Sequence, residues 1–187
     1  MVDRARVFTP TYQHDEKLVS LGKLAAGLAH ELNNPSSAIG RSAGELRAAF
    51  PGFDDAARSL GSAGLNQEQT AVLQKVREAC LAPGVRPVLS PLEQEDREDV
   101  IAKWLRTHRA NEAVAEGLAD TDITIDLLDE LARSMQGQLL NTALGWIATD
   151  CEIRRLTLEI QQASSRICEL VSAVKGFTQM DRAAVPE

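Results

Sequence analysis

Residues 156–177 read LTLEIQQASSRICELVSAVKGF. Apolar side chains recur in this segment at steps of four and three, which is the heptad spacing of a helix that packs along one stripe. The pattern fades after Met180, so it predicts one long helix of about 25 residues or more. The stripe, called the second seam below, consists of Leu156, Ile160, Ala163, Ile167, Leu170, Val174 and Phe177.

A similar stripe, the first seam, lies near the start of the chain and predicts a helix over residues 14–50. Pro35 falls inside it and predicts a kink, because proline lacks a backbone N–H and crowds the preceding turn. Pro51 and Gly52 are the clearest stop, although residues 53–60 can continue the helix. The first seam consists of Leu18, Leu21, Ala25, Leu28, Leu32, Ile39, Ala43 and Leu46.

Short helices are expected between the two seams. Ser90 followed by Pro91 is typical of an N-cap and a first-turn proline. No alternating strand pattern of useful length is found. We therefore expect an all-α fold, a long antiparallel helical hairpin with an inserted small helical subdomain. The expected short helices cover residues 66–80, 91–107, 111–118, 123–135 and 139–149.

The composition narrows the range of functions. The chain has 187 residues and a net charge of −7, and residues 51–150 carry the acidic excess. An acidic balance argues against nucleic-acid binding, which needs a basic surface. No apolar run approaches the ~18 residues that span a bilayer, so no membrane contact is expected within this segment. Three cysteines without paired spacing favour a reducing compartment, and we expect a cytoplasmic location.

The residues that carry chemistry lie in the first helix, where residues 17–35 read KLVSLGKLAAGLAHELNNP. His30 is about 160° around the helix from the seam leucines on either side, so it is expected to face solvent. An exposed imidazole near pH 7 is largely neutral and nucleophilic. Glu31 can orient the ring and accept its proton, and Asn34, one turn on, can offer an amide to a phosphoryl oxygen. These residues suit a phosphoacceptor histidine with Glu31 as acid/base partner.

The run from Ser20 to Pro35 resembles the H-box of sensor histidine kinases in its His-Glu-Leu-Asn-Asn-Pro form. The resemblance implies a dimerisation and histidine-phosphotransfer domain, in which two hairpins form a dimeric four-helix bundle. It implies that His30 is phosphorylated from ATP and passes the phosphoryl group to an aspartate of a response-regulator receiver domain. It also places Asn34 at the position linked to dephosphorylation of the regulator. Residues 166–180 resemble the second helix of the same hairpin.

The sequence departs from that family in two ways. About 100 residues separate helices that a short loop usually joins, and the role of this insertion is left open. The chain also has no glycine-rich ATP-binding motif. We expect ATP and Mg²⁺ to be bound by a separate catalytic domain of the same protein, with no cofactor or metal held by this segment. The expected parts are a lead-in at 1–13, the hairpin at 14–51 and 150–182, the insertion at 52–149, and a linker to the ATP-binding domain at 183–187.

Other residues allow further interpretations. His30 and Glu31 could open a zinc motif of the His-Glu-x-x-His type, but position 34 is asparagine. The cysteines could form a redox site, although small buried thiols are favoured. The acidic run 93–99 is expected to be a solvated helix start, with recruitment of a partner as the alternative. The remaining candidates, expected on the surface or in the core, are His14, His108, Trp104 and Trp146.

Two functions therefore follow from the sequence. The first is the phosphoacceptor and dimerisation part of a protein-histidine kinase, whose partners are a second copy, its ATP-binding domain and a receiver domain. The alternative is a non-catalytic phosphorelay or dimeric scaffold protein.

Overall fold

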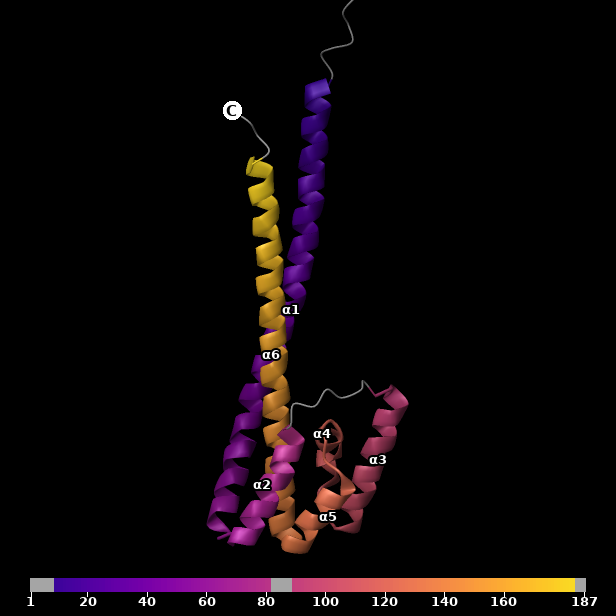
Figure 1. Cartoon of the computed structure of the whole chain (residues 1–187), viewed down its shortest axis with the longest axis vertical. Helices are drawn as coiled ribbons and strands as arrows, with labels where there is room; N and C mark the ends of the chain where they lie inside the picture. Colours follow the sequence, from indigo (N-terminus) through magenta and orange to yellow (C-terminus); the bar gives the residue numbers. More distant parts are fainter. Residues whose placement is uncertain (1–8, 82–88, 184–187) are drawn as a thin grey trace, which may run out of the picture. The chain divides into compact units, whose positions relative to one another are not determined.

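The computed structural model describes residues 9–81 and 89–183, with side chains for residues 22–23, 25–81 and 89–176. Over these ranges all regular secondary structure is helical, and the prediction of an all-α fold is confirmed. The elements, labelled in Figure 1, are α1 (Thr9–Ser62), α2 (Gln67–Leu81), α3 (Pro91–Thr107), η1 (Glu112–Val114), α4 (Ala115–Ala119), α5 (Ile125–Ser134) and α6 (Gly137–Ala183).

The chain divides into two compact units, and both long helices contribute to each of them. Unit 1 contains residues up to Ser42 and from Glu159 onward, and unit 2 contains Ala43–Leu158. Unit 1 is a pair of helical segments from α1 and α6 that run in opposite directions (Figure 1). Unit 2 holds the ends of the same two helices together with the five shorter elements.

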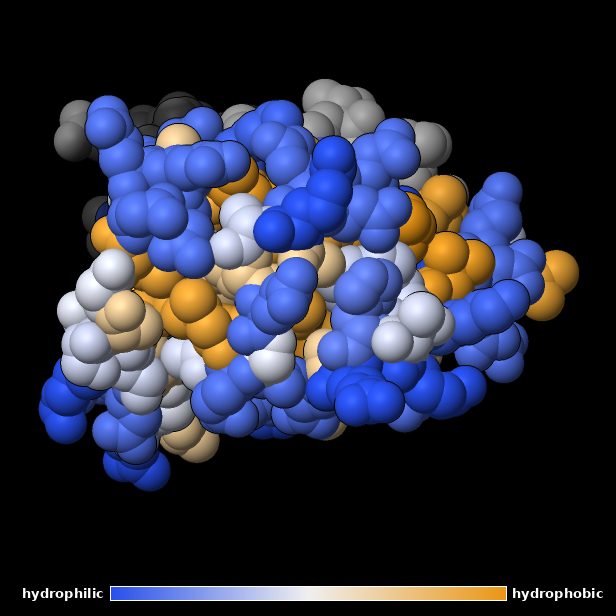
Figure 2. Space-filling view, turned by 90° about the horizontal axis from the view of Figure 1, so that it is seen from below, coloured by the Kyte–Doolittle hydropathy of each residue, from blue (hydrophilic) through white to orange (hydrophobic). Residues whose placement is uncertain are grey.

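Unit 2 has a closed apolar core. Helix α2 packs on α5, while α3 packs on α4 and η1. Several core side chains have no exposed surface at all, including those of Leu105, Leu118 and Leu128. Burying one such leucine contributes about 2 kcal/mol before the entropy of ordering is subtracted. Polar residues surround smaller apolar areas on the face shown in Figure 2.

Unit 1 lacks such a core. Among its described side chains no apolar residue is buried, and the seam residues are half-buried. The half-buried positions of α6 within this unit include Ile160, Ala163, Ile167, Leu170 and Val174, as the second seam predicts. Two helices cover each other on one side only, so the heptad stripe is only half shielded in a single chain. The first seam is half-buried at Leu28, Leu32 and Ile39, whereas Ala25 is exposed.

One register assignment in the first seam is wrong. Ala43 is exposed, and Ser42 is the buried residue, at 5% exposure. A strict four–three repeat from Leu32 passes through Pro35, Ile39 and Ser42, and the polar hydroxyl hides this continuation from a search for apolar residues. The Ser42 hydroxyl donates a hydrogen bond to Glu159 Oε2 at 2.8 Å, which compensates for its burial in unit 1.

The long helices extend further than predicted. Helix α1 begins at Thr9, ahead of the expected residue 14, and runs through Pro51 and Gly52 to Ser62. Helix α6 begins at Gly137, so the expected helix at 139–149 is its first part. Packing of Leu60 in the core of unit 2 offsets the cost of a proline and a glycine inside α1.

The short helices lie close to their predicted positions. Helices α2 and α3 match the expected ranges within one residue, and Ser90 is the N-cap of α3. Two of the expected helices differ in detail, since 111–118 divides into η1 and α4 and α5 is shorter than 123–135. The seam side chains of Leu18, Leu21 and Phe177 lie outside the described residues. No helix in the described ranges has the length and apolar character needed to cross a bilayer.

Candidate functional site

His30 lies on an exposed face of α1 in unit 1. The half-buried Leu28 and Leu32 flank it in sequence, whereas the His30 side chain itself is exposed. Residues spaced four and three apart share this side of the helix because the helical period is 3.6 residues. This set, called the His30 face below, is exposed throughout and consists of Lys23, Gly27, His30, Asn34, Ser37 and Arg41.

The three predicted site residues are close along the helix but are not equivalent in position. His30 and Asn34 are one turn apart on the same face, whereas Glu31 is displaced by about 100° around the axis. All three side chains are exposed, and no hydrogen bond joins any of them to another described residue. The imidazole is therefore accessible within the chain, and the carboxylate must lean toward it to take part in proton transfer.

Pro35 changes the hydrogen bonding just after His30. Proline has no backbone N–H, so the carbonyl of Glu31, four residues earlier, receives no helical hydrogen bond from position 35. In the next turn the Ser36 hydroxyl donates to the carbonyl oxygen of Leu32 at 2.7 Å. Helix α1 continues through Pro35. The Glu31 carbonyl beside the candidate site therefore lacks its usual backbone donor.

The helix surface next to His30 is open because small residues line it. A Cβ atom added to Gly22 or Gly27 would meet no other heavy atom within 4 Å. Ala25, Ala26 and Gly27 are all exposed. A second protein domain can therefore approach the imidazole closely, with Lys23 and Arg41 as cationic groups on the same face.

His108 and the two tryptophans pack against neighbouring side chains of unit 2. His108 is half-buried, contrary to the expected surface position, because its ring stacks on Trp104 with centroids 3.9 Å apart. The Trp104 indole donates to Asp129 Oδ1 at 2.6 Å, as fits a core residue. Trp146 stacks on Phe53 with centroids 6.0 Å apart. The side chain of His14 lies outside the described residues.

Four long-range polar contacts of unit 2, three of them made by Arg97, were not anticipated from the sequence. Arg97, inside the acidic run, donates to the backbone carbonyls of Ala119, Thr121 and Ile123. These hydrogen bonds connect α3 to the end of α4 and to the loop before α5. The acidic run 93–99 therefore contributes to tertiary packing and is not only a solvated helix start. The fourth contact is an ion pair between Arg77 of α2 and Asp150 of α6, with 2.6 Å between Nε and Oδ2.

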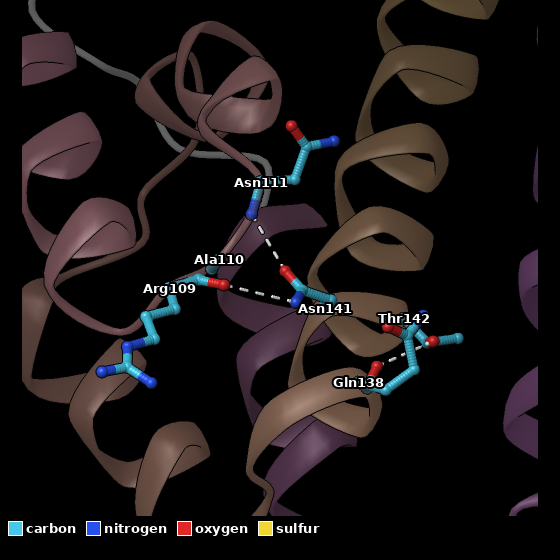
Figure 3. A pocket seen from close by; sticks show the side chains of 6 residues that line it. All are labelled: Arg109, Ala110, Asn111, Gln138, Asn141 and Thr142. Atoms are coloured by element: carbon cyan, nitrogen blue, oxygen red, sulfur yellow. Dashed lines mark hydrogen bonds between the residues drawn. The ribbon is translucent and has the colours of Figure 1, made fainter.

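A polar pocket of unit 2 lies where the turn after α3 meets the first turns of α6 (Figure 3). Its volume is about 500 Å³, and Arg109 in the turn has a positive φ of 55°. The Asn141 side chain accepts from the Asn111 N–H at 2.9 Å and donates to the Arg109 carbonyl at 3.5 Å. These bonds hold a backbone conformation that residues other than glycine rarely adopt.

Comparisons with known proteins add no assignment. Scans against protein-family models, curated proteins and solved structures returned no match to this chain. Within the described residues no group of three or more His, Cys, Asp or Glu side chains could hold a metal ion. The candidate site is therefore defined by the residues around His30 alone.

Proposed function

We propose that this chain is the phosphoacceptor and dimerisation region of a sensor histidine kinase, with His30 as the phosphorylated residue. The observation that carries the proposal is the exposed His30 on the face of α1 opposite a half-buried seam. The His-Glu-Leu-Asn-Asn-Pro sequence around it gives the resemblance its specificity.

The proposed reaction is a phosphoryl transfer to nitrogen. One ring nitrogen of His30 attacks the γ-phosphorus of ATP, a P–N bond forms, and the bond to the ADP oxygen breaks. The proton on the other ring nitrogen passes to Glu31 or to water. The separate ATP-binding domain and its Mg²⁺ supply positioning and charge neutralisation. Asn34, one turn from His30, is placed to contact a phosphoryl oxygen or a water.

Dimerisation is the second part of the proposal. Unit 1 leaves the sides of Ile160, Ile167 and Leu170 partly open to solvent in a single chain. A second copy of the same helix pair offers an identical apolar stripe, and two pairs give the four-helix arrangement of a bundle. His30 stays on the outside of such a bundle because it faces away from the seam.

The decisive experiment measures phosphorylation of the full chain. The protein is incubated with ATP labelled at the γ-phosphate, Mg²⁺ and the ATP-binding domain of a histidine kinase supplied in trans. We expect acid-labile label on His30 and complete loss of label in His30→Gln. His108→Gln serves as the matched control and should retain the label, since that ring is stacked on Trp104.

A second phosphodonor separates the proposal from the alternative functions. Phosphoramidate transfers a phosphoryl group to histidine without an enzyme, so it reports on the reactivity of His30 alone. Label from phosphoramidate but never from ATP favours a non-catalytic phosphorelay protein. A dimer whose His30 accepts phosphate from neither donor is a scaffold, and the proposed phosphoacceptor role is then wrong.

A further inference from the structure

A second cavity of unit 2, called the Arg109 cavity below, shares Arg109 with the polar pocket of Figure 3. Its volume is about 740 Å³, a size that accommodates a small organic molecule. Its lining comes from the turn after α3, from α5 and from the start of α6. The fold therefore brings the turn at residues 108–109 together with residues 129–140, and none of these belongs to the His30 face.

Two arginines on the Arg109 cavity have no carboxylate partner. Arg109 and Arg133 both line it, both are exposed, and neither forms an ion pair with a described residue. By contrast, Arg77 and Arg106 of the same unit each pair with a carboxylate. A guanidinium group that is not already paired can bind a carboxylate through two parallel N–H donors. The cavity therefore offers two such donors to a ligand.

The lining residues carry a net positive charge. The only carboxylate among the described lining residues is that of Asp129, whose Oδ1 accepts a hydrogen bond from the Trp104 indole at 2.6 Å. The Nε of Arg133 donates to the backbone carbonyl of Asp129 at 3.2 Å, which leaves the two terminal nitrogens of this guanidinium available. With two arginines against one aspartate, the cavity favours an anion.

The turn that carries Arg109 is held in a conformation better suited to another residue. Its φ of 55° is one that glycine adopts without strain, yet the chain has an arginine here. The Asn141 side chain holds the turn through its bonds to the Arg109 carbonyl and the Asn111 N–H. In Figure 3 the Arg109 side chain extends away from Asn141. The guanidinium is therefore not used to hold the turn.

Apolar and aromatic groups complete the lining of the Arg109 cavity. Leu140 is 3% exposed, and Ala132 lies beside the arginine of the same helix. The His108 ring is fixed by stacking on Trp104 and by a hydrogen bond from its Nδ1 to the Trp104 carbonyl at 2.9 Å. A carbon skeleton can pack on these groups while its charged ends meet the arginines. The lining therefore suits an organic anion better than an inorganic one.

We propose that the Arg109 cavity is a binding site for a small organic dicarboxylate, with one carboxylate on the Arg109 guanidinium and the other on that of Arg133. The carbon chain of the ligand packs against Leu140 and the His108 ring. Two separate guanidinium groups favour two separate carboxylates over the single compact charge of inorganic phosphate. The site lies in unit 2 and is independent of the proposed role of His30.

The experiment measures binding of succinate and of glutarate to the full chain by isothermal titration calorimetry, with the ionic strength held constant by KCl. At least one of the two should bind saturably with a dissociation constant below about 1 mM. Succinamide has the carbon chain of succinate without its charges, and inorganic phosphate is a compact anion. Both should bind at least about tenfold more weakly.

Three variants locate the binding. Arg109→Gly removes one guanidinium and fits the positive φ of the turn, while Arg133→Gln removes the other at an exposed position. Each should weaken binding by about tenfold or more, because charge-assisted hydrogen bonds are lost. Lys103→Gln is the matched control, since it removes one positive charge from the exposed surface of α3 outside the cavity. It should leave the affinity unchanged.

Three results overturn the proposal. The first is that neither dicarboxylate binds saturably, and the second is that phosphate or succinamide binds as tightly as the dicarboxylates. The third is that the two arginine variants bind like Lys103→Gln. If circular dichroism shows that one arginine variant is unfolded, the affinity of the other decides.

Discussion

Unit 1 and unit 2 share the same two long helices but shield their apolar residues to different degrees. In unit 2 the side chains of Leu105, Leu118 and Leu128 are fully buried among shorter helices. In unit 1 the described seam residues, such as Leu170, are half-buried. The difference arises because unit 2 surrounds its core on several sides, whereas the described part of unit 1 consists of two helical segments.

This contrast separates stability from association. A closed core makes the free energy of unfolding depend on contacts within one chain. A half-covered apolar stripe is fully shielded only when a second molecule covers it. Its contribution to the free energy of unfolding then depends on protein concentration. We therefore expect substitutions in unit 2 to act at any concentration, and substitutions in the seam of unit 1 to act mainly through assembly.

The largest effect is expected from Leu128→Ala in unit 2. Leu128 has no exposed surface, and truncation of such a leucine leaves a cavity that costs about 3 kcal/mol. The matched change in unit 1, Leu170→Ala, should cost about 1 kcal/mol or less in dilute solution, because this side chain is half-exposed in a single chain. Urea unfolding at low protein concentration measures both. Equal costs for the two leucines would contradict the contrast.

The next effect concerns assembly. Ile167→Asp places a charge in the seam of unit 1 and should weaken dimerisation by about 100-fold, since a buried unpaired charge is costly. Ser165→Asp, at an exposed position on the same helix, is the control and should leave dimerisation unchanged. Sedimentation velocity over a range of concentrations measures the dissociation constant. A wild-type chain that stays monomeric at all concentrations would show that no second copy covers the seam.

The same contrast explains which features of the fold were accessible from the sequence. The start of α3 was predictable because Ser90 and Pro91 form a local capping signal. The passage of α1 through Pro51 was not, because it depends on packing of residues such as Leu60 in a core assembled from distant segments. The second seam was predictable from its apolar period alone, whereas burial of Ser42 depends on Glu159, 117 positions away.

The same difference between local signals and contacts of distant segments applies to the candidate site. Exposure of His30 was predictable from helical geometry, because its neighbours define the seam on the opposite side. The ion pair between Arg77 and Asp150 joins distant segments, so sequence spacing gave no sign of it. Local chemistry is therefore readable in unit 1, while in unit 2 it arises from tertiary contacts.

A smaller effect on stability is expected at Ser42, the buried polar residue in line with the first seam. Ser42→Ala removes the hydrogen bond to Glu159 and should cost about 1 kcal/mol. Ser37→Ala, on the exposed side of the same helix, is the control and should have an effect near zero. A double-mutant cycle with Glu159→Ala, which removes the acceptor, isolates the pair when measured by thermal unfolding. Zero coupling energy would show that Ser42 contributes nothing to the register of unit 1.

An effect of similar size tests the short helices, whose ends depend on local caps and not on a seam. The Ser90 hydroxyl accepts from the Glu93 N–H, and the Glu93 carboxylate accepts from the Ser90 N–H at 2.7 Å. Ser90→Ala should cost about 1 kcal/mol of unit 2 stability, as is typical for loss of an N-cap. Leu92→Ala, an exposed residue of the same turn, should cost less.

The capping box also predicts a pH dependence. Hydrogen bonds from Ser90 lower the pKa of Glu93 below its ordinary value of 4.5, because they favour the carboxylate. The folded state therefore holds this proton less tightly than the unfolded state. The stabilisation is fully present above pH 4.5 and is lost as the pH falls through the lowered pKa. Glu93→Gln should flatten this part of the stability profile, measured by urea unfolding between pH 3 and pH 6, and an unchanged slope would show that the carboxylate is not held by the cap.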